Sequence, residues 1–269
     1  MRAILLAAGQ GLRLQYPPER QLPKCLLRFG GVSLLERHWR LLTQAGIDDI
    51  VLAVGFRREM IEEEIERLAW RPRLAVNERY ELGSVLTVHT VTDALTAGGE
   101  VLLMDADVLY HAEIMARLVD GAGPINRLLI DRHFDAGEEP VKVCVRNGTP
   151  IELRKQLAPE LQYDTIGESI GFFRLDESAA LRFAELVCGY IDSSRAHLPH
   201  EEAVRDLIQE GSHPFDAADV TGIPWMEIDF AADVMRAERD VLPRLNLPAR
   251  SLPSAVPLPG RGPRVAQGE

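Results

Sequence analysis

Short apolar segments alternate with amphipathic segments along the first half of this 269-residue chain. The apolar segments have the length of strands, and the segments between them carry apolar residues at helical spacing. We expect strands over residues 3–8, 49–55, 73–76 and 101–104, and helices over residues 34–45, 59–69 and 84–97. This alternation indicates an α/β fold with crossover helices, because parallel neighbours need long connections. A hydrophobic content of 46% supplies a sizeable core.

The pattern changes after Gly121. Strands are expected over residues 128–130, 141–145, 170–174 and 226–228, with Asn147-Gly148 as a hairpin turn, and helices over residues 177–188, 201–209 and 231–242. The central sheet should therefore be mixed, mostly parallel and flanked by helices. We expect a single domain over residues 1–242. Residues 243–269 are rich in Pro, Gly, Ser and Arg without periodicity, which is typical of a disordered tail.

The charge balance and the cysteines exclude several classes of protein. Lys plus Arg number 30 against 41 Asp plus Glu, so this acidic chain lacks the basic field that nucleic acid or an anionic membrane surface needs. The three cysteines are odd in number and form no CxxC pair, which favours reduced thiols over disulfides or zinc. No apolar run approaches the roughly eighteen residues of a membrane helix, and the N-terminal run is too short for a signal peptide. We expect a cytoplasmic protein without membrane insertion.

A glycine-rich loop follows the first expected strand. It carries Gly9, Gly11 and Arg13, and Lys24 follows after a short gap. Glycines let backbone amides approach a phosphate closely, and the two cations add positive charge. The loop therefore predicts an anionic ligand, with a nucleoside triphosphate as the favoured candidate. An ordinary strand-to-helix turn would explain the glycines alone, but Arg13 and Lys24 favour the phosphate site.

Carboxylates stand at two places where a metal ion would be useful. Asp105 and Asp107 follow an expected core strand, and ligands of open α/β sheets bind at the carboxyl ends of strands. Asp229 precedes the closing helix, with Glu227 on the same face of its strand. Mg²⁺ with a triphosphate needs few protein carboxylates. The alternative to metal binding is a structural role: an Asp of the pair Asp105 and Asp107 would cap the following turn, and Asp229 would cap the closing helix. We interpret Asp105 as hydrogen-bonding support and Asp233 as a surface carboxylate.

Several further polar residues fit either a ligand contact or an ordinary structural role. The candidates are a possible helix N-cap, two lysines that could be solvated, an acid in a glycine-bracketed strand entry and two acids at a helix start: Ser84, Lys142, Lys155, Glu168, Glu201 and Glu202. The chain has no GxSxG motif, its histidines show no metal spacing, and Cys25 is interpreted as a buried structural thiol. This pattern favours in-line displacement at phosphorus over covalent catalysis.

Taken together, these residues resemble a known signature. Leu6-Ala-Ala-Gly9-Gln-Gly11-Leu-Arg13 with Pro23-Lys24-Cys-Leu-Leu27 is similar to the signature of sugar-phosphate and phospho-alcohol nucleotidyltransferases. Further pieces resemble the phosphocholine-type cytidylyltransferases, which include inositol-phosphate and phosphonate cytidylyltransferases: Asp105-Ala-Asp107, Val141-Lys142-Val143, Lys155, Gly167-Glu-Ser-Ile-Gly171, Glu201-Glu202-Ala203 and Pro224-Trp-Met-Glu-Ile-Asp229-Phe-Ala-Ala-Asp233. The resemblance spans roughly residues 1–242. It implies a Rossmann-like nucleotidyltransferase fold and Mg²⁺-dependent condensation of CTP with a phosphorylated or phosphonylated small alcohol, with release of pyrophosphate.

The resemblance also implies a role for each matching residue. The loop with Ala8, Gly9 and Gly11 would hold the base and triphosphate, and Arg13 and Lys24 would neutralise the phosphates. Gly83 and Ser84 would lie by the nucleobase, and Asp107 and Asp229 would hold Mg²⁺. Lys142 and Lys155 would contact the acceptor phosphate or the reacting α-phosphate. Glu168 belongs to a matching motif that suits close ligand approach, and Glu201 or Glu202 would line the acceptor end.

Two departures from the family pattern leave alternatives open. Leu12 stands where the family usually has Ser or Thr, and Glu81-Leu82-Gly83-Ser84 stands where it usually has a pair of Asn. One alternative is a sugar-1-phosphate nucleotidyltransferase that uses dTTP, UTP or GTP. The other is a catalytically inactive nucleotide-binding regulatory module. A homodimer is also considered.

Overall fold

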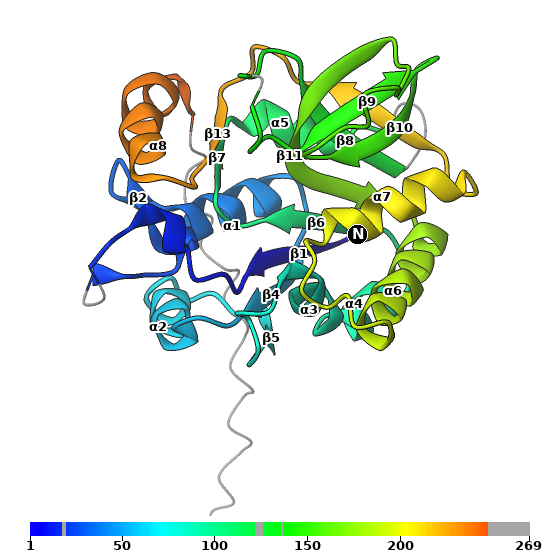
Figure 1. The fold of residues 1–269 in the computed structure, drawn as a ribbon. Coiled ribbons are helices and arrows are strands. Elements are labelled where there is room, and N and C mark those ends of the chain that lie inside the picture. Colours follow the sequence, from blue (N-terminus) through cyan, green and yellow to red (C-terminus); the bar gives the residue numbers. More distant parts are fainter. Residues whose placement is uncertain (18–19, 122–125, 136, 247–269) are drawn as a thin grey trace, which may run out of the picture.

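The computed structural model describes residues 1–17, 20–121, 126–135 and 137–246 (Figure 1). Among these residues, nine strands form one central sheet with helices on both faces. This arrangement confirms the predicted α/β fold with a mixed sheet. The expected tail starts at residue 243, but a 3-10 helix spans Leu242–Arg244, and residues 247–269 lie outside the described residues.

One half of the sheet is parallel, as the alternating pattern predicts. The central strand β1 (Arg2–Ala7) pairs in parallel with β4 (Asp49–Val54) and β6 (Val101–Asp105), and β5 (Arg73–Val76) pairs in parallel with β4. The connecting helices are α1 (Leu34–Gln44), α2 (Arg58–Arg67), α3 (Ser84–His89) and α4 (Thr92–Thr96). The carboxyl ends of β1 and β6 therefore lie side by side, which is where a ligand is expected.

The helix expected over residues 84–97 is instead two helices, α3 and α4, with a break at Thr90 and Val91. The Thr90 hydroxyl donates to the carbonyl of Thr87 at 2.7 Å, and the Thr92 hydroxyl donates to the carbonyl of His89 at 2.7 Å. Such local hydrogen bonds compete with the helical ladder, and a run of β-branched residues weakens helix propensity further. The break keeps α3 short beside the ligand-binding edge of the sheet.

The other half of the sheet is built around an antiparallel strand, β11 (Thr165–Leu175). It pairs with β6, β8 (Asn126–Asp131) and β9 (Lys142–Arg146). The predicted Asn147-Gly148 turn is confirmed, with positive φ at both residues, and it leads into β10 (Thr149–Arg154). A further strand, β12 (Phe215–Asp219), pairs in parallel with β8. The predicted hairpin turn implies a strand at β10, although no range was predicted for it, and β12 was not predicted.

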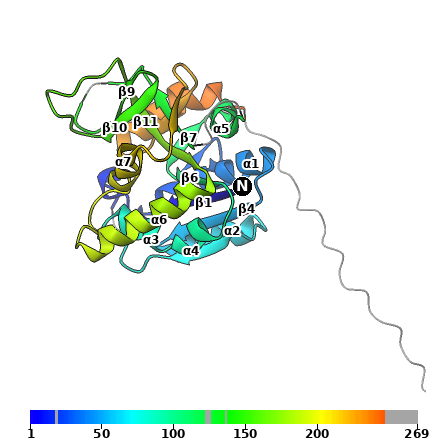
Figure 2. The same ribbon diagram turned by 90° about the vertical axis from the view of Figure 1, so that its right-hand side faces the viewer.

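Alternate residues of β1 point into two separate cores, one on each face of the sheet. Leu5 packs in the core that α1, α2 and α5 (Ala112–Val119) cover. Ile4 packs in the core that α3, α4, α6 (Glu177–Asp192) and α7 (Glu201–Glu210) cover. Figure 2 shows these two helix layers on either side of the strands. None of the helices described is long and apolar enough to cross a membrane.

A small antiparallel sheet joins the C-terminal segment to the parallel half. Strand β7 (Val108–Tyr110) pairs with β13 (Trp225–Glu227), and the backbone N–H of Ile228 donates to the carbonyl of Asp107 at 3.0 Å. Beyond it, the closing helix is divided into α8 (Ala231–Arg236) and a wider π-helical turn over Ala237–Val241. A second small sheet pairs β2 (Arg28–Phe29) with β3 (Val32–Ser33). The pairing of β7 with β13 brings together residues about 120 positions apart in the sequence.

Candidate active site

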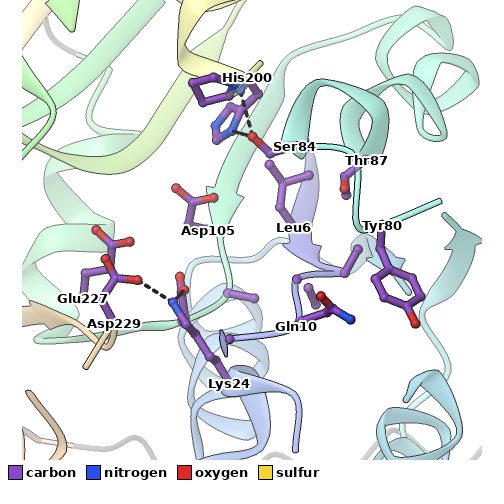
Figure 3. Close-up of a pocket in the computed structure, with 18 of the residues that line it drawn as sticks. Leu6, Gln10, Lys24, Tyr80, Ser84, Thr87, Asp105, His200, Glu227 and Asp229 are labelled. Atoms are coloured by element: carbon purple, nitrogen blue, oxygen red, sulfur yellow. Dashed lines mark hydrogen bonds and ion pairs between the residues drawn. The ribbon is translucent and has the colours of Figure 1, made fainter. Parts of the chain in front are cut away.

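A cavity of about 460 Å³ opens where β1 and β6 end (Figure 3). Its wall joins the glycine-rich loop, the ends of β6 and β13, and the starts of α3 and α7. Most of the residues selected from the sequence line it: Ala8, Gly9, Gly11, Arg13, Lys24, Gly83, Ser84, Asp107, Lys155, Glu201 and Asp229. The fold thus gathers positions that are spread from residue 8 to residue 229.

The glycine-rich loop is not an ordinary strand-to-α-helix turn. After β1 the chain passes through Gly11, at φ +61, into a 3-10 helix over Leu12–Leu14. A Cβ on Gly11 would lie 2.9 Å from Cγ of Lys24, so glycine lets the lysine side chain cross the loop. Cys25 is buried next to this crossing, as expected, and burial raises the pKa of its thiol, with Asp107 adding to the effect. It is therefore a structural thiol.

Lys24 joins the two carboxylates that the sequence selected as metal ligands. Its Nζ donates to Oδ2 of Asp107 at 2.8 Å. It also donates to Oδ1 of Asp229 at 2.5 Å (Figure 3). Burial disfavours the ammonium charge, but Asp107 and Asp229 outweigh this cost and hold the pKa of Lys24 above its usual range. All three side chains are mostly shielded from solvent, so the ion pairs fix their geometry.

Arg13 extends this cluster toward the rim of the cavity. Its Nη2 donates to Oδ1 of Asp229 at 2.8 Å, and its Nη1 donates to Oε2 of Glu139 at 2.7 Å. Lys155 donates to the same Glu139 oxygen at 3.1 Å. Sequence reasoning missed Glu139, which has no motif around it. Lys24, Arg13 and Lys155 thus all face one cavity. Each is paired with a carboxylate, and a phosphate group could take the place of that carboxylate.

Glu227 completes an acidic group with Asp107 and Asp229. One carboxylate oxygen from each of the three lies within 4.8 Å of the others. Glu227 is exposed to the open cavity, but desolvation by the surrounding protein raises its pKa well above its usual range, and the charges of Asp107 and Asp229 add to the rise. Hard oxygen donors that converge in this way are suited to a divalent cation. The donor set therefore fits the metal that the sequence predicted at this place.

Asp229 does not cap the closing helix, so that alternative is wrong. Phe230 is the N-cap residue, and Oδ2 of Asp233 accepts hydrogen bonds from the backbone N–H groups of Asp229 at 3.1 Å and Phe230 at 2.7 Å. The Asp233 side chain is only 15% exposed, which also contradicts its interpretation as a surface carboxylate. An acid three residues into a helix is typical of reciprocal capping. Asp233 fixes the backbone that carries Asp229.

Asp105 also lines the cavity, and its side chain lies against Gly171 of β11. Gly171 in β11 makes room for it: the glycine has φ +75, and a Cβ there would lie 2.3 Å from Oδ2 of Asp105. Burial raises the pKa of Asp105 well above its usual range, and the charges of Glu201, Asp107 and Glu227 raise it further. The strand bulge at Gly171 is thus shaped around this carboxylate.

Ser84 connects the start of α3 to the start of α7. Its Oγ accepts a hydrogen bond from the backbone N–H of His200 at 2.8 Å and lies 3.2 Å from Nδ1 of the same residue. Ser84 is not the helix N-cap: that residue is Gly83, where a Cβ would lie 2.7 Å from the backbone of His197. Sequence reasoning missed His200, since a single histidine before a helix carries no local signal.

Lys142 lies outside the lining of this cavity. Its Nζ donates to the carbonyl oxygens of Gly137 at 2.6 Å and Lys155 at 2.7 Å. These bonds tie the hairpin strand β9 to the segment after β10. In this conformation Lys142 supports the backbone next to Lys155.

Glu168 also lies outside the cavity lining, in the ladder opposite Lys142 and Asp131. Burial raises its pKa to about 7, and the charges of Asp131 and Asp135 contribute. Lys142 and Arg236 act in the opposite direction. In this conformation Glu168 is therefore an acid of the central sheet that titrates near neutral pH, and it does not line the cavity.

Glu202 lines a second cavity, of about 540 Å³, which adjoins the first. Arg154 donates to its two carboxylate oxygens at 2.9 and 2.5 Å. The two cavities share Glu139, Lys155 and Glu201 in their walls. The second cavity thus extends the first away from the glycine-rich loop.

Comparisons with known proteins show the family of this chain. The family described as the MobA-like NTP transferase domain matches residues 3–168. A bifunctional IPC transferase and DIPP synthase of Rubrobacter xylanophilus is 29% identical over 243 residues, covering 89% of this chain and 52% of that protein. The choline-phosphate cytidylyltransferase of Streptococcus pneumoniae is 36% identical over 108 residues, covering 40% of this chain and 44% of that protein. The chain spans about half the length of the curated relatives it matches.

A solved structure shares the fold. The inositol-1-phosphate CTP transferase of T. maritima superposes with a TM-score of 0.72 at 19% identity, over 90% of this chain and 95% of that one. The family match takes in more than half of the chain, and we conclude that this protein belongs to the MobA-like NTP transferase domain family of nucleotidyltransferases.

Proposed function

We propose that this chain transfers CMP from CTP to a phosphorylated or phosphonylated small alcohol, with Mg²⁺ as the metal. The observation that carries the proposal is the convergence of Lys24, Asp107 and Asp229 at the end of β6, beside the glycine-rich loop. Phosphoryl chemistry depends mainly on positioning and on neutralising charge, and both requirements suit this group. The relatives with inositol-phosphate or choline-phosphate in their names support an acceptor of this class.

In the proposed reaction, an oxygen of the acceptor's phosphate attacks the α-phosphorus of CTP. A P–O bond forms to the acceptor, and the bond from the α-phosphorus to the β-bridging oxygen breaks, so pyrophosphate leaves with that electron pair. The nucleophile is already ionised at neutral pH, so the site needs no strong general base. A Mg²⁺ ion bound by Asp107, Glu227 and Asp229 would neutralise charge on phosphate oxygens.

The protein's own residues position the two substrates. Backbone amides at Gly9 and Gly11 face the triphosphate, and Arg13 and Lys24 exchange their carboxylate partners for phosphate oxygens. Gly83 and Ser84 line the base side of the cavity. Lys155 and Glu201 face the acceptor side, where the adjoining cavity begins.

Lys142, Glu168 and Glu202 are assigned to the outer part of the acceptor end. Lys142 braces the backbone of Lys155, and Glu202 orders Arg154 in the adjoining cavity. Glu168 lies opposite Lys142 on the neighbouring strand, and neither residue lines the two cavities in this conformation. The cytoplasmic location and the homodimer stay predictions.

A pyrophosphate-release screen tests the proposal. CTP, UTP, GTP, ATP and dTTP are each combined with phosphocholine, inositol 1-phosphate, an aminoalkylphosphonate and a sugar 1-phosphate, with Mg²⁺ present. We expect release with CTP and one of the first three acceptors. Release only with a sugar 1-phosphate and another triphosphate would move the protein to the sugar-nucleotide class. Nucleotide binding without release in any combination would indicate a regulatory module.

A matched pair of variants ties the activity to the cavity. We expect Asp107→Asn to lower kcat/KM by about 10³-fold, the loss typical of removing one electrostatic group from a transition-state site. Asp93→Asn is the control, because Asp93 is an exposed acid on α4, away from the cavity lining. A near-normal rate in Asp107→Asn would show that the acidic cluster is not the reaction site.

A further inference from the structure

A second convergent group lies in the same cavity, and the proposed reaction does not use it as a unit. One ring nitrogen of His200 and one carboxylate oxygen each of Asp105 and Glu201 lie within 4.8 Å of one another. None of these residues belongs to the cluster of Asp107, Glu227 and Asp229. The second group differs chemically from the first because it includes a nitrogen donor.

His200 has a ligand atom that the fold leaves unused. The side chain is only 2% exposed, and its Nε2 is buried without a hydrogen-bond partner among the described residues. Oε2 of Glu201, which lies 3.1 Å from Nδ1 of His200, is likewise buried without a hydrogen-bond partner in that part of the chain. Buried polar atoms without a hydrogen-bond partner destabilise a fold, so such atoms in a cavity wall point to a missing partner.

The ring of His200 is held in place from two sides. Ser84 Oγ lies 3.2 Å from Nδ1 and accepts the backbone N–H of the same residue, and the ring of Phe173 packs edge-on with a centroid distance of 6.1 Å. Nδ1 also lies 3.1 Å from Oε2 of Glu201, so either ring nitrogen can act as the ligand atom; in the tautomer that carries the proton on Nδ1, the lone pair is on Nε2. An imidazole fixed through its other nitrogen is the usual arrangement around a metal-binding histidine.

Asp105 and Glu201 bring two carboxyl groups close together in a partly buried place. Lys24, which could have compensated them, is already bonded to Asp107 and Asp229. Gly171 leaves space for Oδ2 of Asp105, since a Cβ at residue 171 would collide with it. The fold thus places two acids next to each other and beside an imidazole without a partner. A cation bound by all three side chains would offset this unfavourable arrangement.

We propose that Asp105, His200 and Glu201 form a second divalent-cation site, separate from the cluster at Lys24. Its nitrogen and oxygen donors suit a transition ion such as Zn²⁺, Co²⁺ or Mn²⁺ better than Mg²⁺, which prefers oxygen alone. The site adjoins Ser84, which contacts His200. The proposal does not depend on which nucleotide or acceptor the cavity takes.

Histidine-ring ¹⁵N NMR of the full chain during titration with Zn²⁺ tests the proposal directly. The cluster of Asp107, Glu227 and Asp229 contains no histidine, so zinc bound there leaves the ring signals in place. We expect one ring nitrogen of His200 to move strongly upfield and to saturate at one equivalent. The signal is assigned by its loss in His200→Gln. Unchanged His200 ring signals at saturating Zn²⁺ would overturn the proposal.

Calorimetry with Co²⁺ provides the second measurement. In the Asp107→Asn/Asp229→Asn background, which removes the first cluster, we expect one equivalent of Co²⁺ to bind. His200→Gln should weaken that binding at least tenfold, and Ser84→Ala should weaken it about tenfold through loss of ring orientation. His89→Gln, at the other end of α3, should leave it unchanged. Equal Co²⁺ affinity with and without His200 would contradict the assignment, and the NMR titration decides the question if a variant fails to fold.

Discussion

Replacing Lys24 with methionine should lower activity and at the same time strengthen binding of a free divalent cation. Lys24 holds Asp107 and Asp229 through contacts of 2.8 and 2.5 Å, so any metal that enters without nucleotide must displace an ammonium that is already bonded to both ligands. Methionine keeps the length of the side chain but has no charge. The two acids and Glu227 are then left without their main counter-charge.

The size of the effect follows from the contacts. A pair of unit charges 4 Å apart interacts by about 4 kcal/mol at an effective dielectric constant near 20. Desolvation of the ammonium and partial exposure of the carboxylates cancel part of that attraction. We expect a net gain of about 2 kcal/mol for the metal, which is roughly a 30-fold lower Kd for Mn²⁺ in the absence of nucleotide. Loss of a phosphate contact should lower kcat/KM about 10²- to 10³-fold.

Mn²⁺ electron paramagnetic resonance and a pyrophosphate assay measure the two quantities on the same preparation. Lys155→Met is the matched control, because Lys155 contacts Glu139 and none of the three clustered acids, so Mn²⁺ affinity should change little. A Lys24→Met variant whose Mn²⁺ affinity falls together with activity would refute the reasoning, since it would show that the lysine assists the free ion instead of competing with it.

Three further predictions concern stability. In urea denaturation, Gly171→Ala should lower the free energy of unfolding by more than about 2 kcal/mol, because residue 171 has a positive φ and its new Cβ would collide with Asp105. The control is Gly189→Ala, inside α6 with open space around it, which should raise the free energy of unfolding by up to about 1 kcal/mol. Asp233→Ala should lower the free energy of unfolding by about 1 kcal/mol, because two hydrogen bonds at the start of α8 are lost, and the affinity for Mn²⁺ should fall as well. An unchanged affinity for Mn²⁺ would show that Asp233 caps the helix without positioning Asp229 for the metal. The pKa of Glu168 is raised to about 7 in the folded state, so the folded protein binds this proton more tightly than the unfolded chain. The free energy of unfolding should therefore fall by about 1–2 kcal/mol as pH rises from 5 to 8. This fall should be absent in Glu168→Gln, and a variant with the same pH profile as the parent would argue against the raised pKa.

Local signals in the sequence were sufficient where a residue's role depends on its own neighbourhood. The apolar runs predicted β1, β4 and β6, and the glycines with Arg13 and Lys24 predicted a charged loop at the end of β1. The Asn147-Gly148 pair predicted the hairpin because both residues adopt positive φ readily. These features are set by propensity and periodicity within a few residues.

Other features depend on partners far away in the sequence. The N-capping alternative for Asp229 could not be excluded locally, since the residue that displaces it from that role, Asp233, is recognised only through two backbone hydrogen bonds. Lys142 alternates with apolar residues as a ligand-binding lysine would, yet its ammonium is bonded to carbonyls of the neighbouring loop. His200 acquires its surroundings only when α7 packs against Ser84.

The central claim is that this cavity transfers a nucleotidyl group to a phosphorylated acceptor. It is tested most directly by following labelled phosphate from CTP in the presence of Mg²⁺ and the acceptor found in the screen. We predict that label in the α-phosphate appears in the acceptor product and that label in the γ-phosphate appears in pyrophosphate. Transfer of the γ-label to the acceptor, or release of α-labelled CMP without incorporation, would contradict the account.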